Sequence, residues 1–221
     1  ARLLESKGIV SASEFLAATK QEEILKKYGI PASSAEGYLF PETYYFPKEY
    51  PAIRVVETMV ETFFQRVSAI LRDDTLPTGK ELFHRVILAS IVEREYRDPE
   101  EAPLIASVFY NRLKIRMPLG SCATIEYVLT EELGKPHPDV LTYADLEVPS
   151  LYNTYKHSGL PPGPICNPGE TALKAAFYPA DTEYRYFVLK DPEAGRHYFS
   201  KTLQEHIQAK VVYLKKIQPG S

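Results

Sequence analysis

Two glutamates separated by one residue, Glu93 and Glu95, are the strongest candidates for chemistry in this sequence. They directly follow the apolar run Val86–Val92, which is typical of a helix buried in the middle of a domain. Residues two apart in a helix point roughly 200° apart, so both carboxylates cannot serve one site from the same face. Glu95 falls on the face of Leu88 and Ile91, and a carboxyl group at the edge of an apolar core holds its proton near neutral pH. The spacing therefore indicates Glu95 as a general acid, with a solvated helix end as the alternative.

The elements that must position these glutamates follow from the spacing of apolar residues, which predicts helices through most of the chain. The expected helices are two or three short ones within 1–30, then about 52–73, 80–96, one opened by Asp98 and Pro99, 122–131, 169–178 and 202–216. Alternation over 184–189, a turn at 191–195 and a return at 197–199 predict a hairpin. The aromatic segment 36–46 is expected to be extended and to join that sheet. The predicted fold class is α+β, mainly helical with a small β-sheet.

The composition excludes several classes of protein. A net charge of −3, from 26 basic and 29 acidic residues, gives no electrostatic reason to expect a nucleic-acid partner. The run Val86–Val92 is far shorter than the roughly 20 apolar residues that span a membrane. The opening residues, Ala1–Leu4, lack a signal-peptide pattern and read as the inside of a helix. We therefore expect a piece of a longer protein, with any N-terminal membrane anchor outside this sequence.

A series of motifs, in a fixed order, carries a resemblance to a known family. The motifs are Glu36–Tyr44, Leu88–Glu95, Ala106–Leu113, Met117–Leu119, Tyr152–Tyr155, Gly159–Ile165, and His197–Phe199 with Thr202 and His206. Together they resemble the MltG (YceG-like) family of endolytic murein transglycosylases. The first 30 residues resemble the tail of the LysM-like module that precedes the catalytic domain in that family. The resemblance thus divides the chain into the C-terminal part of a LysM-like module, 1–35, and a YceG-like catalytic domain, 36–221.

The family resemblance implies cleavage of MurNAc-GlcNAc bonds inside peptidoglycan strands, leaving 1,6-anhydro-MurNAc ends. One glutamate acts first as general acid and then as general base, so no second carboxylate is required. The motif favours Glu95 for this role and leaves Glu93 open. A non-catalytic peptidoglycan-binding or scaffold module is the alternative. No cofactor is expected, because the sequence has no glycine-rich phosphate cradle, and His197 and His206 lack a third ligand for a metal.

The motif residues also suggest how a sugar substrate is held. The expected substrate-binding residues are Asn111, Arg112, Ser121, Thr124, Tyr152, Asn153 and Tyr155. Three of them lie in the long irregular stretch 132–170, where tyrosine rings offer a flat platform for sugars. Asn111 and Arg112 could contact sugar or fix the glutamate, with a structural cap as the alternative. For Ser121 and Thr124, capping of a helix competes with substrate binding.

The resemblance also implies a location and partners. It places the domain at the extracytoplasmic face of the bacterial cytoplasmic membrane, held by a single-pass anchor, with glycan strands as substrate and peptidoglycan synthases as partners. Disulfides persist in that compartment, so we expect Cys122 and Cys166, both in motif loops, to be bonded. Many family members have Asp at the position of Cys122, so no role of that Asp carries over.

Overall fold

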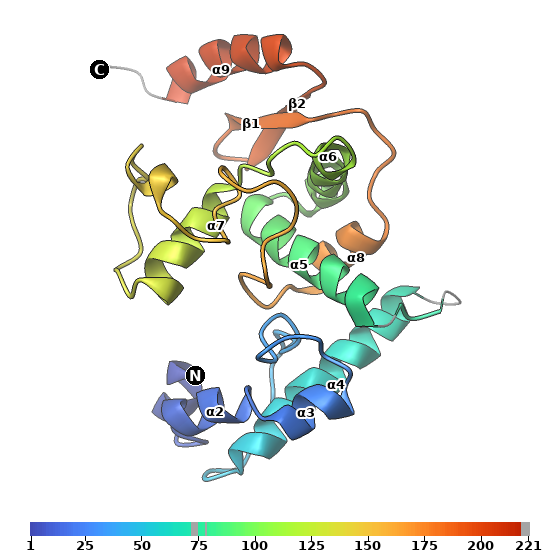
Figure 1. The fold of residues 1–221 in the computed structure, drawn as a ribbon, viewed down its shortest axis with the longest axis vertical. Coiled ribbons are helices and arrows are strands. Elements are labelled where there is room, and N and C mark those ends of the chain that lie inside the picture. Colours follow the sequence, from blue (N-terminus) through green and yellow to red (C-terminus); the bar gives the residue numbers. More distant parts are fainter. Residues whose placement is uncertain (72–74, 78, 218–221) are drawn as a thin grey trace.

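The computed structural model describes residues 1–71, 75–77 and 79–217, and α5 (Gly79–Glu95) runs through its middle (Figure 1). Every residue of Val86–Val92 is buried, which confirms the central helix that the apolar run predicts. Helices α6 (Ala102–Lys114) and α8 (Glu170–Phe177) pack against it. The helix is apolar all round because neighbours cover it on several sides.

The remaining helices follow the predicted pattern closely. α4 (Ala52–Leu71) buries residues at helical spacing, and its predicted continuation over 72–73 lies outside the described residues. A 3₁₀ turn, η1 (Pro99–Glu101), begins where the Asp98 carboxylate accepts a hydrogen bond from the Glu100 amide. The other elements are α7 (Cys122–Tyr127), the π-helical turn η2 (Val128–Glu132), the 3₁₀ turn η3 (Asp145–Glu147) and α9 (Leu203–Ile217).

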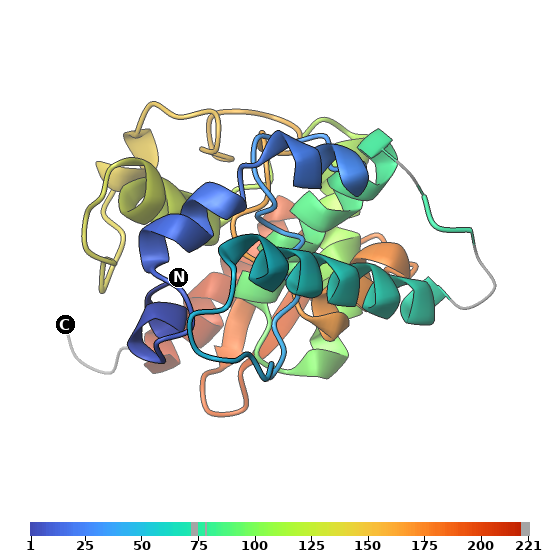
Figure 2. The same ribbon diagram turned by 90° about the horizontal axis from the view of Figure 1, so that it is seen from below.

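Three short helices form the N-terminal part: α1 (Arg2–Ser6), α2 (Ala12–Ala18) and α3 (Glu22–Lys27). α2 begins at the expected capping box, in which the Ser11 hydroxyl accepts from the Glu14 amide. α2 packs on α4, and Figure 2 shows this part beside that helix. Phe15 and Ile24 belong to the same buried cluster as α4 and α5, so the N-terminal part shares the main core. The LysM-like division at residue 35 stays a prediction.

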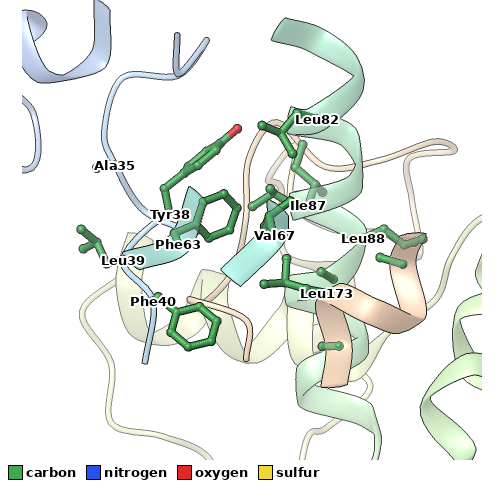
Figure 3. Close-up of a cluster of buried hydrophobic side chains, with 14 of the residues drawn as sticks. Ala35, Tyr38, Leu39, Phe40, Phe63, Val67, Leu82, Ile87, Leu88 and Leu173 are labelled. Carbon is green, nitrogen blue, oxygen red and sulfur yellow. The ribbon is translucent and has the colours of Figure 1, made fainter. Parts of the chain in front are cut away.

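The expectation that the segment 36–46 joins the sheet is wrong, because residues 36–37 form a turn and residues 40–46 have no regular secondary structure. The amides of Gly37 and Leu39 donate to the Asn167 Oδ1 atom, at 2.8 and 3.2 Å, and so pair with a side chain. Tyr38 is buried against Phe63 of α4, with ring centroids 4.9 Å apart (Figure 3). Tyr38 and Phe40 are buried, whereas Tyr45 is exposed, so burial of some of the aromatic side chains holds this segment without a neighbouring strand.

The sheet is the predicted hairpin alone, within the part of the chain that the structure describes. Strands β1 (Tyr186–Asp191) and β2 (Arg196–Ser200) pair antiparallel, with Tyr186 opposite Ser200 and Leu189 opposite His197. α9 packs on the hairpin, which lies beside α6 (Figure 1). The fold is therefore α+β and mainly helical, as predicted.

Candidate active site

The last turn of α5 sends its two glutamates to different neighbours. Glu95 Oε1 accepts a hydrogen bond from the Ser121 hydroxyl at 2.5 Å, on the side where α7 begins. Glu93 Oε2 accepts from the backbone amide of Gly169 at 3.0 Å, at the N-terminal end of α8. The structure therefore confirms that the two carboxylates lie on different faces and do not share a site.

The surroundings of Glu95 favour its protonated form. Burial raises the pKa of the Glu95 carboxyl group above its ordinary value, because a charged carboxylate loses hydration there. The hydrogen bond from Ser121 and the nearby charges of His197 and Arg112 oppose this rise in pKa, and Glu126 adds to it. A carboxyl group with a raised pKa is suited to donate a proton near neutral pH.

Buried hydroxyl groups hold Ser121 in place. The Ser121 amide donates to Thr154 Oγ1 at 3.0 Å, and this oxygen lies 2.9 Å from Thr124 Oγ1. The Thr124 hydroxyl in turn donates to the Ser121 carbonyl at 2.7 Å. Ser121 occupies the N-cap position of α7, yet among the described residues its side chain bonds to Glu95 and makes no capping bond. Ser121 and Thr124, expected to contact substrate or cap a helix, thus face the protein interior.

The solvent-facing side of this site carries Tyr155 and Cys122. The Tyr155 side chain is 37% exposed, and its hydroxyl lies 3.1 Å from Cys122 Sγ. The charge of Glu95 contributes to the raised pKa of both groups, so all three share one electrostatic neighbourhood. Tyr155 is therefore the expected substrate-binding tyrosine that the fold brings to Glu95.

The other two loop residues point elsewhere. Asn153 is fully buried, and its amide group donates to the carbonyls of Leu146 and Val148, both at 2.9 Å. Its Oδ1 atom accepts from the Tyr155 amide at 3.0 Å, so Asn153 shapes the loop that presents Tyr155. Tyr152 packs against Tyr127, with ring centroids 4.8 Å apart. These contacts favour structural roles for both residues.

Asn111 and Arg112 of α6 fasten neighbouring segments to the site. Asn111 donates to the carbonyls of Thr182 and Tyr184, at 2.7 and 3.0 Å, just before β1. Arg112 donates to the carbonyl of Leu119 at 2.5 Å, which holds the segment leading to Ser121. The alternative of a structural role, left open by the sequence, fits both contacts.

The expected disulfide is wrong, since Cys122 and Cys166 are both free thiols. The Cys166 thiol donates to the Ser90 carbonyl at 3.2 Å, whereas Cys122 Sγ contacts Tyr155. Each sulfur is thus directed at a different element and has its own polar partner. Burial raises the pKa of Cys166 to about 12 and also raises the pKa of Cys122.

Sequence reasoning missed several groups near the site. Thr154 lies between two singled-out residues, and nothing in its local pattern separates it from them. Glu101 is not in any of the motifs, and it forms a buried pair with the motif residue His197, whose Nδ1 lies 2.7 Å from Glu101 Oε2. A cavity of about 480 Å³ lies beside α7, lined in part by Glu36, Arg94, Glu126, Tyr127, Glu131 and His137. These groups come from segments far apart in the sequence, so spacing alone could not join them.

Within residues 1–71, 75–77 and 79–217, no cluster of three or more His, Cys, Asp or Glu side chains is placed to hold a metal ion. No helix in those ranges is both long and apolar enough to cross a membrane.

An α+β domain that partly buries a glutamate with a raised pKa at a helix end, near a partly exposed tyrosine, has the parts needed for acid-base chemistry on sugars. A family model described as the YceG-like family matches residues 1–211, and the chain belongs to that family.

Curated relatives carry the name endolytic murein transglycosylase. The chain is 40% identical over 181 residues to the protein of that name from Bacillus subtilis, covering 81% of this chain and 48% of the relative. It is 31% identical over 198 residues to the Streptococcus pneumoniae D39 protein, covering 86% of this chain and 35% of the relative. This chain thus spans about half of these relatives or less.

A solved structure has the same fold. The crystal structure of a YceG-like protein from Listeria monocytogenes superposes with a TM-score of 0.77 at 33% identity, covering 94% of this chain and 70% of that chain.

Proposed function

We propose that this domain is an endolytic lytic transglycosylase, which cleaves MurNAc-GlcNAc bonds within peptidoglycan strands. The observation that carries the proposal is Glu95, a carboxyl group with a raised pKa that Ser121 holds by one oxygen. The names of the relatives support the same activity.

Glu95 performs both proton transfers in this proposal. The protonated carboxyl group gives its proton to the glycosidic oxygen, and the bond between that oxygen and C1 of MurNAc breaks with the electron pair leaving on oxygen. The resulting carboxylate then takes the proton of the C6 hydroxyl as O6 bonds to C1. The products are a new GlcNAc hydroxyl and a 1,6-anhydro ring, and no water is consumed.

Glu93 is less suited to this chemistry. Its carboxylate is engaged with the Gly169 amide, and the Tyr96 hydroxyl lies 3.5 Å away. Glu93 therefore anchors α8 to α5 in this proposal.

The test is digestion of purified peptidoglycan by the wild-type domain, Glu95→Gln and Glu93→Gln, with products identified by mass spectrometry. We expect 1,6-anhydro-MurNAc ends from the wild type and from Glu93→Gln, and none from Glu95→Gln. Binding to peptidoglycan without turnover by the folded wild type would favour the non-catalytic scaffold module instead.

The family resemblance supports a setting for this activity. We place the domain at the extracytoplasmic face of the cytoplasmic membrane, held by an anchor in the full-length protein, with residues 1–35 ending a LysM-like module. Peptidoglycan synthases are the proposed protein partners. A topology reporter fused to the full-length protein, and crosslinking in cells, test the location and the partners.

A further inference from the structure

We propose that Thr154 is a positioning residue for Glu95 and acts through Ser121. The inference rests on the proposed function, since it concerns the same carboxyl group. It assigns a role to a buried hydroxyl that lies within the motif Tyr152–Tyr155 but is not among the expected substrate-binding residues.

The contacts form a continuous chain from Thr154 to the acid. Thr154 Oγ1 accepts from the Ser121 amide at 3.0 Å, and the Ser121 hydroxyl donates to Glu95 Oε1 at 2.5 Å. Thr154 is 1% exposed and Ser121 is 2% exposed, so water does not compete for these bonds. A third hydroxyl, from the fully buried Thr124, bonds to both residues and closes the group.

The backbone of the same segments is fastened as well. The Gly120 amide donates to the Thr154 carbonyl at 3.0 Å, and Pro118 and Ser158 form an isolated antiparallel bridge. The segments 118–121 and 154–158 therefore lie side by side. Thr154 joins them by hydrogen bonds that both its backbone carbonyl and its side chain accept. The position of Ser121 relative to α5 depends on these hydrogen bonds.

The bond from Ser121 separates the functions of the two carboxylate oxygens. Because Ser121 donates to Oε1, that oxygen acts as acceptor and the transferable proton resides on Oε2. Fixing one oxygen therefore fixes the direction of proton donation. Tyr155 follows Thr154 directly and is partly exposed, so a sugar resting on Tyr155 is held in register with the acid.

A role through Glu95 differs from a purely structural role in its pH dependence. The hydrogen bond from Ser121 lowers the pKa of Glu95, whereas burial raises it. Loss of this hydrogen bond should therefore raise the pKa of Glu95 further. The titratable or charged groups that act on Glu95 are Arg112 on α6, Cys122 and Glu126 on α7, Tyr155 next to Thr154, and His197 on β2. Changing Thr154 leaves all of them in the chain, so a shift of the pH profile reports the lost hydrogen bond.

The experiment compares Thr154→Val, which keeps shape but removes the hydroxyl, with Thr154→Ser, which keeps the hydroxyl. We expect Thr154→Val to lower kcat on glycan strands by about 10- to 100-fold with little change in KM, because misplacement of catalytic groups costs about that much. The basic limb of the pH–rate profile of Thr154→Val should move to higher pH than in the wild type. Ser121→Ala should show the same shift. Thr154→Ser should restore most of the rate and the wild-type profile.

Thr19→Val is the matched control, because Thr19 is 5% exposed and donates to the Leu16 carbonyl at 2.8 Å, in the N-terminal part. Thermal unfolding of each variant sets an assay temperature at which all are folded. A wild-type rate in Thr154→Val, or a lower rate with an unmoved basic limb, overturns the positioning role. Full activity of Glu95→Gln overturns the assignment of Glu95 as the acid, and absence of 1,6-anhydro-MurNAc ends from the folded wild type overturns the proposed function; both results are separate from the test of Thr154.

Discussion

Each of the two sides of the last turn of α5 has one glutamate and one cysteine, but the surroundings of these residues differ between the sides. One side has Glu95 and, near it, the half-exposed pair of Tyr155 and Cys122. The other side has Glu93 bonded to the start of α8, and Cys166, from the loop before α8, donates to the Ser90 carbonyl of α5. We call these the Glu95 side and the Glu93 side. In our proposal the environment, more than the residue type, decides whether a glutamate acts as an acid or as an anchor.

The largest difference between the two sides should be in activity. Glu95→Gln keeps the size of the side chain but removes the transferable proton, so we expect the rate on glycan strands to fall by about 10²–10⁴-fold. Glu93→Gln should keep a rate within a few-fold of the wild type, since its amide oxygen can still accept from Gly169. Initial rates of anhydro-end formation measure both. An inactive, folded Glu93→Gln beside an active Glu95→Gln would exchange the roles of the two sides.

Thiol reactivity should separate the sides next. Cys122 is exposed whereas Cys166 is more deeply placed and has a pKa near 12, so we expect Cys122 to react faster by about an order of magnitude or more. Maleimide labelling of the native protein, read by peptide mass spectrometry, gives both rates. Thiol counting on the denatured, unreduced protein should find two free groups, and finding none would restore the disulfide.

Stability should depend more on the Glu93 side than on the Glu95 side. Glu93→Ala removes the acceptor for the Gly169 amide at the start of α8, and loss of a bond to a charged group costs about 1–3 kcal/mol. Chemical denaturation should show this as a lower midpoint with an unchanged slope. A midpoint equal to the wild type would mean that Glu93 does not anchor α8.

The smallest expected effect is a gain in stability from Glu95→Gln. Because the pKa of Glu95 is raised in the folded state, its favourable contribution is present below the unfolded pKa, about 4.3, and is lost as pH rises through the folded pKa. The free energy of unfolding of Glu95→Gln should therefore increase relative to that of the wild type as pH increases from 4 to 8. Unfolding free energies of both proteins across that range test the sign. A difference that is constant with pH would mean that Glu95 ionises as it does in the unfolded chain.

Strong local patterns made most of the fold predictable. The buried run of α5, the amphipathic spacing of α4 and the alternation in the hairpin each carry their own signal, and all three elements are present. The strand expected at 36–46 failed because aromatic residues favour extended structure whether or not a partner strand exists. The side chain of Asn167 takes that place, and no local rule finds it.

The candidate site was predictable only in part. The helical period placed Glu95 and Glu93 on separate faces from the sequence alone. The partners of each glutamate are distant in the chain, since Ser121 lies 26 positions from Glu95 and Gly169 lies 76 from Glu93. Compartment chemistry suggested a disulfide, but pairing depends on where each sulfur points, which the sequence does not encode locally.

The link between Gly37 and Asn167, 130 positions apart, has a consequence for the order in which the molecule is made. At about 5–20 residues per second, a ribosome reaches Asn167 several seconds or more after Gly37 has emerged. In the same interval α5 is made before Gly169, the partner of Glu93, and before Thr154, which holds the Ser121 partner of Glu95. A nascent chain that stops before residue 154 holds Glu95 without the group that orients Ser121. The acid is therefore set in place only when translation is well past the middle of the domain.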